Sequence, residues 1–520
     1  MVEATVPLPP APASAGPRRE PRWSLVAAIL GSTMAFVDGT VVNVALPVME
    51  REMRASVDAM QWVVEAYALL LASLVLVGGA LGDRLGRRRV FVSGVLGFSV
   101  ASAVCGFAPS VGFLIFARAV QGTFAALLVP GSLALIGAAY PDDARPAAIG
   151  TWSAATSIAA AVGPLLGGWA VVHTSWRVIF FFNVPLGGAV ALIATRKVEE
   201  TRDSEAGKRI DLAGASLAIL SLGAIVWALL EAPNLGGISS PRVLVPLGSG
   251  AALLALFVFV EGRSRDPMVP LGLFRSRAFA ATNLVTLFLY AALGACLFFV
   301  PFDLIQVQGY SPAGAGAALA PMVVLISVLS RRAGALVPKY GARPLLVVGP
   351  LLAALGFALL AVPSVGGTYW STFFGGVTFL GLGMGVTVAP LTATVMGSVD
   401  PRHTGVASGI NNAVSRAAGL LAVAALGVML VERFDATLDR ELSKLSLPGD
   451  VLAVVARERP KLAAADLPST FGEGLRRTLE RAFEAAFVSG FRALMFACAA
   501  LAILSALTSF VLIPRKQPKS

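Results

Sequence analysis

Apolar segments long enough to cross a lipid bilayer recur along the whole chain. A transmembrane helix needs roughly 20 mainly apolar residues. The 520-residue sequence is 56% hydrophobic and only 14% charged, which is typical of a polytopic membrane protein. The pattern predicts an all-α membrane protein with fourteen spans, at 24–48, 60–82, 90–108, 111–137, 146–171, 176–195, 211–231, 243–261, 279–303, 312–330, 344–362, 369–397, 404–431 and 487–513.

The distribution of lysine and arginine predicts which side of the membrane each loop faces. Cytoplasmic loops carry an excess of these residues, and most of the 41 in this chain fall in segments on the side of the N-terminus. We therefore expect both termini in the cytoplasm, in a multi-pass protein of the cytoplasmic (inner) cell membrane. Because this bias accounts for the net charge of +11, we expect no nucleic-acid partner.

The spans and loops divide the chain into five parts. These are a disordered cytoplasmic N-terminus at 1–23, a six-helix bundle at 24–196, a linker with two additional transmembrane helices at 197–262, a second six-helix bundle at 263–513, and a cytoplasmic tail at 514–520.

A long segment within the second bundle, 432–486, is expected on the outer side. Apolar residues at helical spacing predict two amphipathic helices there. They would form either a cap packed on the outer face or a receptor-binding surface.

The two bundles carry an internal repeat. The loop GALGDRLGRRR at 79–89 aligns without gaps with GALVPKYGARP at 334–344, at an offset of 255 residues. Similarly, LLVPGSLALIGAAYPDD at 127–143 is echoed by VTVAPLTATVMGSVDP at 386–401. Paired membrane repeats are typical of secondary transporters, whose substrate site lies between the halves near mid-membrane.

Three ionisable residues, Asp38, Glu65 and Arg118, lie within spans of the first half. A charge at mid-membrane costs roughly 2.5–3.5 kcal/mol on insertion scales, so such residues are functional candidates by default. We expect the three to meet in the outer half of the first bundle and to act in proton coupling. The alternative is a permanent buried ion pair that only fixes helix packing.

The second half has fewer polar residues at membrane depth. Arg416 is its one deep charge, and Asp303, near the outer end of the ninth span, is expected to be solvated. Further candidates to line a central cavity, together with Arg416, are Asn43, Asn411 and Asn412.

Five motifs in order along the chain resemble those of the major facilitator superfamily, and within it the fourteen-span drug:proton antiporter group. The first three are VDGTVVNVALP at 37–47, GALGDRLGRRR at 79–89 and FLIFARAVQG at 113–122, the last of which contains Arg118. The others are GPLLGG at 163–168 and SWRVIFFFNVPLGG at 175–188. The resemblance covers nearly the whole chain and implies a major facilitator fold of two six-helix bundles with two inserted helices.

The resemblance also implies roles for two of these motifs. The loop motif would act as a gating latch that stabilises the outward-facing state, through Gly79, Asp83, Arg84, Gly86, Arg87 and Arg88. The alternative is that its arginines only hold the loop inside. The antiporter helix motif would act through Gly163, Pro164, Gly167 and Gly168, either as a hinge or by simple close packing.

Other classes of function leave no signal. The sequence has no GxxxxGK[ST] loop and no HExxH motif, and its two histidines lie in short loops, so we expect no enzyme, cofactor or metal site. The three cysteines fall in apolar runs and are expected to be buried thiols.

We therefore expect a monomeric, proton-coupled antiporter that exports amphipathic small molecules across the lipid bilayer. Its partners would be the small-molecule substrate and protons. The alternatives are a transporter of lipids or endogenous metabolites with the same fold, and a non-transporting receptor or scaffold that acts through 432–486.

Overall fold

Helices account for all the regular structure in the described part of the chain. The computed structural model describes residues 20–55, 57–141, 144–202, 211–232, 235–264, 267–400, 404–445, 447–468 and 470–514. The expected N-terminal disorder up to residue 19, and the tail from residue 515, lie outside these residues. The first helix begins at Pro21, slightly before the predicted boundary of the first span.

Thirteen of the described helices are long and apolar enough to cross a membrane. The predicted fifth span is also a helix, α5 (Arg145–His173, 29 residues), but it is not among the thirteen. Several residues in its second half, Pro164 among them, have side chains outside the described set. The all-α membrane fold is confirmed, and the count of fourteen spans stays a prediction.

The first half contains seven helical elements. They are α1 (Pro21–Met53), α2 (Val57–Leu85), α3 (Arg87–Gly106), α4 (Val111–Ala139), α5, α6 (Val178–Phe181) and α7 (Asn183–Lys197). The short α6 and α7 together form the predicted sixth span. Two apolar clusters hold this half together, one around Phe91 and Phe98 and one around Trp176 and Phe180.

The second half repeats this arrangement. It contains η1 (Leu271–Arg275), α10 (Arg277–Phe302), the π-helical turn η2 (Asp303–Val307), α11 (Pro312–Ala318), α12 (Ala320–Tyr340), α13 (Ala342–Leu360), α14 (Tyr369–Thr372), α15 (Phe374–Gly397), α16 (Thr404–Ser443), α17 (Gly449–Glu458), η4 (Arg459–Ala464) and α18 (Glu473–Leu512).

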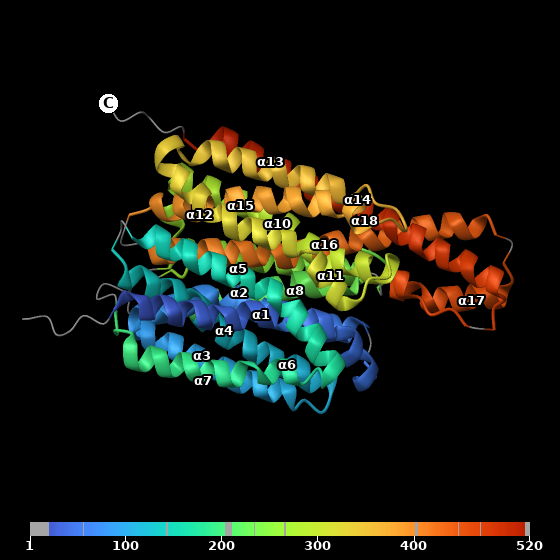
Figure 1. Ribbon diagram of the computed structural model, residues 1–520, viewed down its shortest axis with the longest axis horizontal. Helices are drawn as coiled ribbons and strands as arrows, with labels where there is room; N and C mark the ends of the chain where they lie inside the picture. The colour runs from blue at the N-terminus through green and yellow to red at the C-terminus, as the bar shows by residue number, and fades with distance from the viewer. Residues whose placement is uncertain are drawn as a thin grey trace, which may run out of the picture.

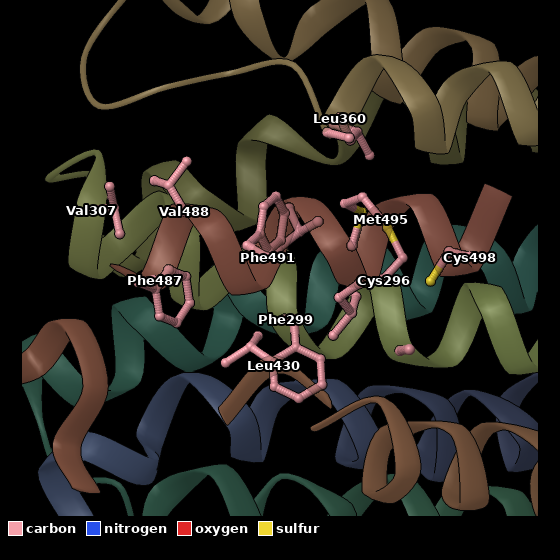
Figure 2. Packing of buried hydrophobic residues seen from close by; sticks show 14 of the residues in the cluster. Cys296, Phe299, Val307, Leu360, Leu430, Phe487, Val488, Phe491, Met495 and Cys498 are labelled. Atoms are coloured by element: carbon pink, nitrogen blue, oxygen red, sulfur yellow. The ribbon is translucent and has the colours of Figure 1, made fainter. Parts of the chain in front are cut away.

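The core of the second half gathers around α18. Figure 2 shows Phe487, Phe491 and Met495 of α18 lying against Phe299 of α10 and Leu430 of α16. All three cysteines are free and buried, as the sequence predicts.

The two halves lie side by side along the long axis of the molecule (Figure 1). Helices that correspond in the two halves pack alike: α2 on α4 as α12 on α15, and α3 on α7 as α13 on α18. Between the halves, α2 packs on α16 and α5 packs on α12. The internal repeat of the sequence is therefore a pseudo-twofold arrangement of helices.

The inserted helices are α8 (Leu212–Glu231) and α9 (Pro241–Arg263). α8 packs against both α2 and α16, and so touches both halves. α9 packs on α8 and leaves apolar residues such as Val245 and Phe259 exposed on its other face. That face is expected in a helix that borders lipid.

The segment 432–486 projects beyond the bundle as a helical extension around α17 (Figure 1). Its two predicted amphipathic helices are present, but they are continuous with transmembrane helices, because α16 and α18 each run for 40 residues. Phe434 and Leu438 of α16 pack against Leu479 and Phe483 of α18 within one apolar cluster. The core of the second half therefore continues into the extension.

Candidate functional site

The Asp38 carboxylate lies at the centre of a buried polar cluster in the first half. Only 1% of Asp38 and 1% of Arg118 is exposed. Arg118 Nη1 donates to Asp38 Oδ2 at 2.5 Å. Asp38 Oδ1 accepts from Gln121 Nε2 at 2.9 Å and from Asn183 Nδ2 at 3.3 Å. The structure therefore brings Asp38 and Arg118 together, as the sequence predicts. It adds two amide side chains, Gln121 and Asn183, that the sequence analysis did not single out.

The partners of Asp38 are themselves held in place. Arg118 Nε donates to the Val63 carbonyl oxygen at 3.1 Å, and its guanidinium lies 4.3 Å from the centre of the Tyr67 ring. Asn183 Nδ2 also donates to Ser102 Oγ at 2.9 Å. Each side chain of the cluster therefore has at least one hydrogen-bond partner, as a buried charge requires.

The local sequence of α4 explains why this cluster forms. Arg118 and Gln121 are three residues apart, so they lie on one face of the helix and Gln121 Oε1 accepts from Arg118 Nη1 at 2.7 Å. Gly122 brings α4 close to α2, because a Cβ added there would lie 2.4 Å from the Tyr67 carbonyl oxygen. The span-four motif thus positions the arginine and the helix contact together.

Glu65 is buried but does not join this cluster. It is 6% exposed, its Oε2 has no hydrogen-bond partner, and no ion pair among the described residues links it to Arg118. Val63 and Tyr67, which contact Arg118, are each two residues away, which is about 200° around a helix. Glu65 shares its face with Leu69, which packs against α8 and α16. The predicted three-residue meeting is therefore found for Asp38 and Arg118 alone.

The antiporter helix motif packs α5 directly onto α1 beside Asp38. A Cβ added to Gly163 would lie 2.1 Å from Thr40 Oγ1, and one added to Gly167 would lie 2.6 Å from Val41 Cγ2. Gly168 is buried, and the side chain of Pro164 lies outside the described residues. The geometry supports the close-packing role of this motif. The contact also joins the motif at 163–168 to the motif at 37–47.

The loop motif folds onto the end of α7. Gly86 has a φ of 111°, and an added Cβ would lie 2.5 Å from Glu200 Oε1. The backbone N–H groups of Arg88 and Arg89 donate to the Glu200 carboxylate at 3.0 and 3.2 Å. Glu200 therefore places a negative charge at the N-terminus of α3, where the helix dipole favours it. Glu200 lies 117 residues beyond Asp83 in the chain, and nothing in the motif points to it.

The remaining residues of the loop motif make shorter-range contacts. Asp83 Oδ1 accepts from Arg87 Nη2 at 2.9 Å, one turn away. Arg84 Nη1 is buried and has no hydrogen-bond partner. A Cβ added to Gly79 would lie 3.9 Å from Pro130 Cβ on α4.

The same contact recurs in the second half. Arg88 Nη1 donates to the Val198 carbonyl oxygen at 3.1 Å, and the equivalent Arg343 donates through Nη2 to the Phe510 carbonyl oxygen. In each half the loop arginine therefore binds the end of the last span.

The candidate cavity residues of the second half lie on α16. Asn411 Nδ2 donates to Thr286 Oγ1 at 2.6 Å, and Asn412 Nδ2 donates to the Ser408 carbonyl oxygen at 3.0 Å. Arg416 reaches the first half, 5.9 Å from the centre of the Phe36 ring on α1, and its buried Nε has no hydrogen-bond partner. The side chain of Asn43 lies outside the described residues.

Asp303 is not solvated, contrary to expectation. It is 1% exposed, because the π-helical turn η2 directs it inward, where Gln308 Nε2 donates to Oδ2 at 3.4 Å. Among the described residues, no group of three or more His, Cys, Asp or Glu side chains is arranged to hold a metal ion.

Two pseudo-symmetric bundles with a charged cluster in one of them define a polytopic membrane transporter. Residues 28–423 match the family model described as Major Facilitator Superfamily. The chain belongs to this family, and it is a transporter, not an enzyme.

Curated relatives cover nearly the whole chain. It is 36% identical over 490 residues to "Multidrug resistance protein Stp" of Mycobacterium tuberculosis (strain CDC 1551 / Oshkosh), covering 92% of this chain and 90% of that protein. It is 32% identical to the "Tetracenomycin C resistance and export protein" of Streptomyces glaucescens, covering 95% of this chain and 92% of that protein. The "Multidrug efflux pump LfrA" of Mycolicibacterium smegmatis is 30% identical, with coverage of 89% and 91%.

Solved structures agree on the fold. One is a bacterial homologue of the human lysosomal transporter Spinster in an inward-facing, unoccupied conformation. It aligns with a TM-score of 0.62 at 18% identity, covering 97% of this chain and 100% of that one. This likeness shows the major facilitator fold, and the family match and the candidate spans make the chain a multi-pass membrane protein.

Proposed function

We propose that this protein exports amphipathic drugs or related small molecules across the cytoplasmic (inner) membrane in exchange for protons. The names of the relatives support drug export, since they include multidrug and antibiotic resistance proteins. The two bundles would alternate access by rocking around a site between them, as a pseudo-twofold transporter does. The proposed working unit is the monomer.

The observation that carries the coupling proposal is the Asp38–Arg118 pair. The Asp38 carboxylate accepts hydrogen bonds from Arg118, Gln121 and Asn183 at membrane depth. Protonation of Asp38 removes the attraction and leaves Arg118 as an unpaired buried charge, which is strongly unfavourable. Proton binding therefore changes the energy of the contact between α1 and α4, and so favours a different arrangement of the bundle.

The neighbouring elements would convert that change into movement. α1 also carries Thr40 and Val41, which pack against the glycines of α5, and α5 packs on α12 of the other half. On the far side of the proposed cavity, Arg416 of α16 reaches Phe36 of α1. We propose that Arg416, Asn411, Asn412 and Asn43 line the cavity, and that the loop motif with Asp83 latches the outward-facing state.

The experiment that tests coupling compares Asp38→Asn with the double variant Asp38→Asn/Arg118→Gln in proteoliposomes. Ethidium serves as an amphipathic cation, and a pH-sensitive dye reports proton movement. Asp38→Asn cannot release a proton, so uphill ethidium export on a pH gradient should fall to the level of empty vesicles.

The double variant separates coupling from folding. Asp38→Asn alone leaves Arg118 unpaired, which costs about 3–5 kcal/mol when a buried pair is broken. Removing both charges should recover much of the thermal stability in detergent without restoring uphill export. Either variant exporting ethidium against its gradient at the wild-type rate would refute the role of Asp38.

Export of a self-made metabolite is the second candidate. Its support is that one relative, from Streptomyces glaucescens, is named for resistance to and export of a single compound, tetracenomycin C. A proteoliposome screen that pairs each candidate cargo with the proton signal distinguishes the two. A receptor or scaffold would move no protons with any cargo.

A further inference from the structure

Arg416 is a charged side chain in the membrane-spanning part of α16 that has no polar partner in the described part of the chain. Its Nε is buried without a hydrogen-bond partner, while the side chain as a whole is only half-buried. Among the described residues it forms no hydrogen bond and no ion pair. A charge at membrane depth without an acceptor is unfavourable, and such a group marks a functional site by default.

Other arginines of the spans show how the fold satisfies such a group. Arg118 donates to a carboxylate, an amide and a backbone carbonyl oxygen. Arg492 Nε donates to the Ala361 carbonyl oxygen at 3.0 Å. Arg416 has five N–H donors of the same kind and none of these acceptors. The missing acceptor is therefore one that a bound molecule can supply.

Phe36 links Arg416 to a second aromatic ring of the first half. The Arg416 guanidinium lies 5.9 Å from the centre of the Phe36 ring on α1. Phe36 meets the Trp152 ring of α5 edge to face, with the ring centres 6.4 Å apart. Trp152 Nε1 donates to Ser32 Oγ at 3.0 Å, which fixes the indole in place. Both rings are half-buried, so an aromatic surface from α1 and α5 lies beside an unpartnered cation from α16.

We propose that Arg416, Phe36 and Trp152 anchor aromatic cargo that carries an acidic oxygen, as a carboxylate or an ionised phenol. This inference rests on the proposed export function and names the class of cargo that the site prefers. A carboxylate can accept two N–H groups of one guanidinium, and an aromatic ring system can pack against the two rings. A cation without such an oxygen gains no contact from Arg416 and is repelled by its charge.

The anchor is separate from the proposed proton-coupling pair. Phe36 and Asp38 are two residues apart on α1, which is about 200° around the helix. Phe36 therefore faces Arg416, while Asp38 faces Arg118 on the other side of α1. A substitution of Arg416 thus changes cargo recognition and leaves the coupling pair intact.

The binding test uses two dyes that differ in one group, rhodamine B with its free carboxylate and the ethyl ester of rhodamine B. Fluorescence anisotropy follows their binding to the purified full-length protein in detergent, with protein-free micelles subtracted. The wild type is compared with Arg416→Gln, Arg416→Lys and the matched control Arg433→Gln, an exposed arginine of the same helix.

The wild type and Arg433→Gln should bind rhodamine B roughly tenfold or more tightly than its ester, because only the free carboxylate pairs with Arg416. Arg416→Gln should bind the two dyes alike. Arg416→Lys keeps the charge but loses the planar fork, so its preference for rhodamine B should be smaller than that of the wild type.

Thermal stability and transport separate the anchor from folding and from export. Arg416→Gln removes an unpaired charge and breaks no ion pair among the described residues, so its thermal midpoint should equal or exceed that of the wild type. In proteoliposomes with a pH gradient, Arg416→Gln should lose uphill export of rhodamine B and keep that of the ester.

A wild type that binds the two dyes alike would overturn the anchor, and so would an equal loss of both dyes in Arg416→Gln. If Arg416→Gln does not fold, Arg416→Lys decides, because a preference as large as in the wild type would contradict the paired carboxylate. If the wild type exports neither dye but shows the preference in binding that depends on Arg416, the proposed antiport fails and the anchor stands.

Discussion

Glu65 is a buried carboxyl group whose Oε2 has no hydrogen-bond partner. Its substitution should therefore change transport without lowering the stability of the fold. Glu65→Gln removes the ionisable group and breaks no ion pair among the described residues, so the thermal midpoint should stay the same or rise. If Glu65 attracts cationic cargo, export of ethidium should fall severalfold while export of a neutral drug is kept. An equal loss for cationic and neutral cargo in proteoliposomes would contradict this role.

The sequence predicted the charged residues of the site but not their amide partners. Asp38 and Arg118 could be paired in advance, because isolated charges at membrane depth need a counter-charge. Gln121 and Asn183 carry no charge and were not singled out, although each lies inside one of the five motifs, at 113–122 and at 175–188. Glu65 lies at a similar depth, but its place on the opposite face of α2 became clear only once Val63 and Tyr67 were seen to face Arg118.

The contact between α1 and α5 is so close that a single methyl group should disturb it. In Gly163→Ala the new Cβ would lie 2.1 Å from Thr40 Oγ1 and 3.2 Å from the Val37 carbonyl oxygen. Overpacking of this kind typically costs about 1–3 kcal/mol. The matched control is Gly150→Ala in the same helix, where an added Cβ meets nothing within 4 Å.

We expect Gly163→Ala to lower the thermal midpoint and the export rate, while Gly150→Ala leaves both unchanged. Thr40→Ala removes the nearest atom of the clash and should partly rescue Gly163→Ala. If both glycine variants behave alike in melting and transport assays, the close α1–α5 contact is not required.

The helical extension contains a buried carboxylate whose titration should be visible. Burial alone would raise the pKa of Glu458, but hydrogen bonds from Lys461 Nζ and the Asp466 N–H, with the charges of Lys461 and Arg457, lower it below its ordinary value of 4.5. Folding therefore favours the ionised form. Its contribution is complete above the unfolded pKa and is lost as the pH falls through the folded one.

Acidification below about pH 4.5 should accordingly increase corrected hydrogen exchange in α17 and η4. In Glu458→Gln this part of the pH dependence should be absent, and protection should be lower at neutral pH. Exchange that is insensitive to pH in the wild type would show that Glu458 does not tie the extension together.

At the level of helices, the sequence predicted the repeat of helices in the two halves. It did not predict that transmembrane helices continue into the extension. The offset between the two loops located equivalent helices because both halves need the same turn, with a positive φ at Gly86 and at Gly341. The span predicted at 404–431 and the amphipathic helix predicted after it form one continuous helix, α16, which ends at Ser443. Hydropathy falls where the helix leaves the apolar layer, but its hydrogen bonding does not end there.

Across the whole molecule, the helices of the two halves are arranged alike, but their buried charged residues differ. The contacts α2–α16 and α5–α12 are related by the pseudo-twofold arrangement. The Asp38 cluster has no charged counterpart, since the residue that aligns with Asp38 at the offset of 255 is Leu293. One half would thus respond to protons, while the other contributes Arg416 to the contact between the halves.

The orientation in the membrane is the last prediction, and the buried native cysteines make it testable. Because Cys105, Cys296 and Cys498 are buried, a membrane-impermeant maleimide should label the wild type weakly. Single cysteines then replace Glu473 in the extension and Arg89 in the loop motif, whose side chains are 73% and 65% exposed.

The excess of arginine around residues 84–89 predicts that this loop faces the cytoplasm. Intact cells should therefore be labelled at position 473 only, and inside-out vesicles at position 89 only. If both positions are labelled from the same side, an odd number of membrane crossings does not separate them, and both the fourteen-span count and the outer location of the extension fall.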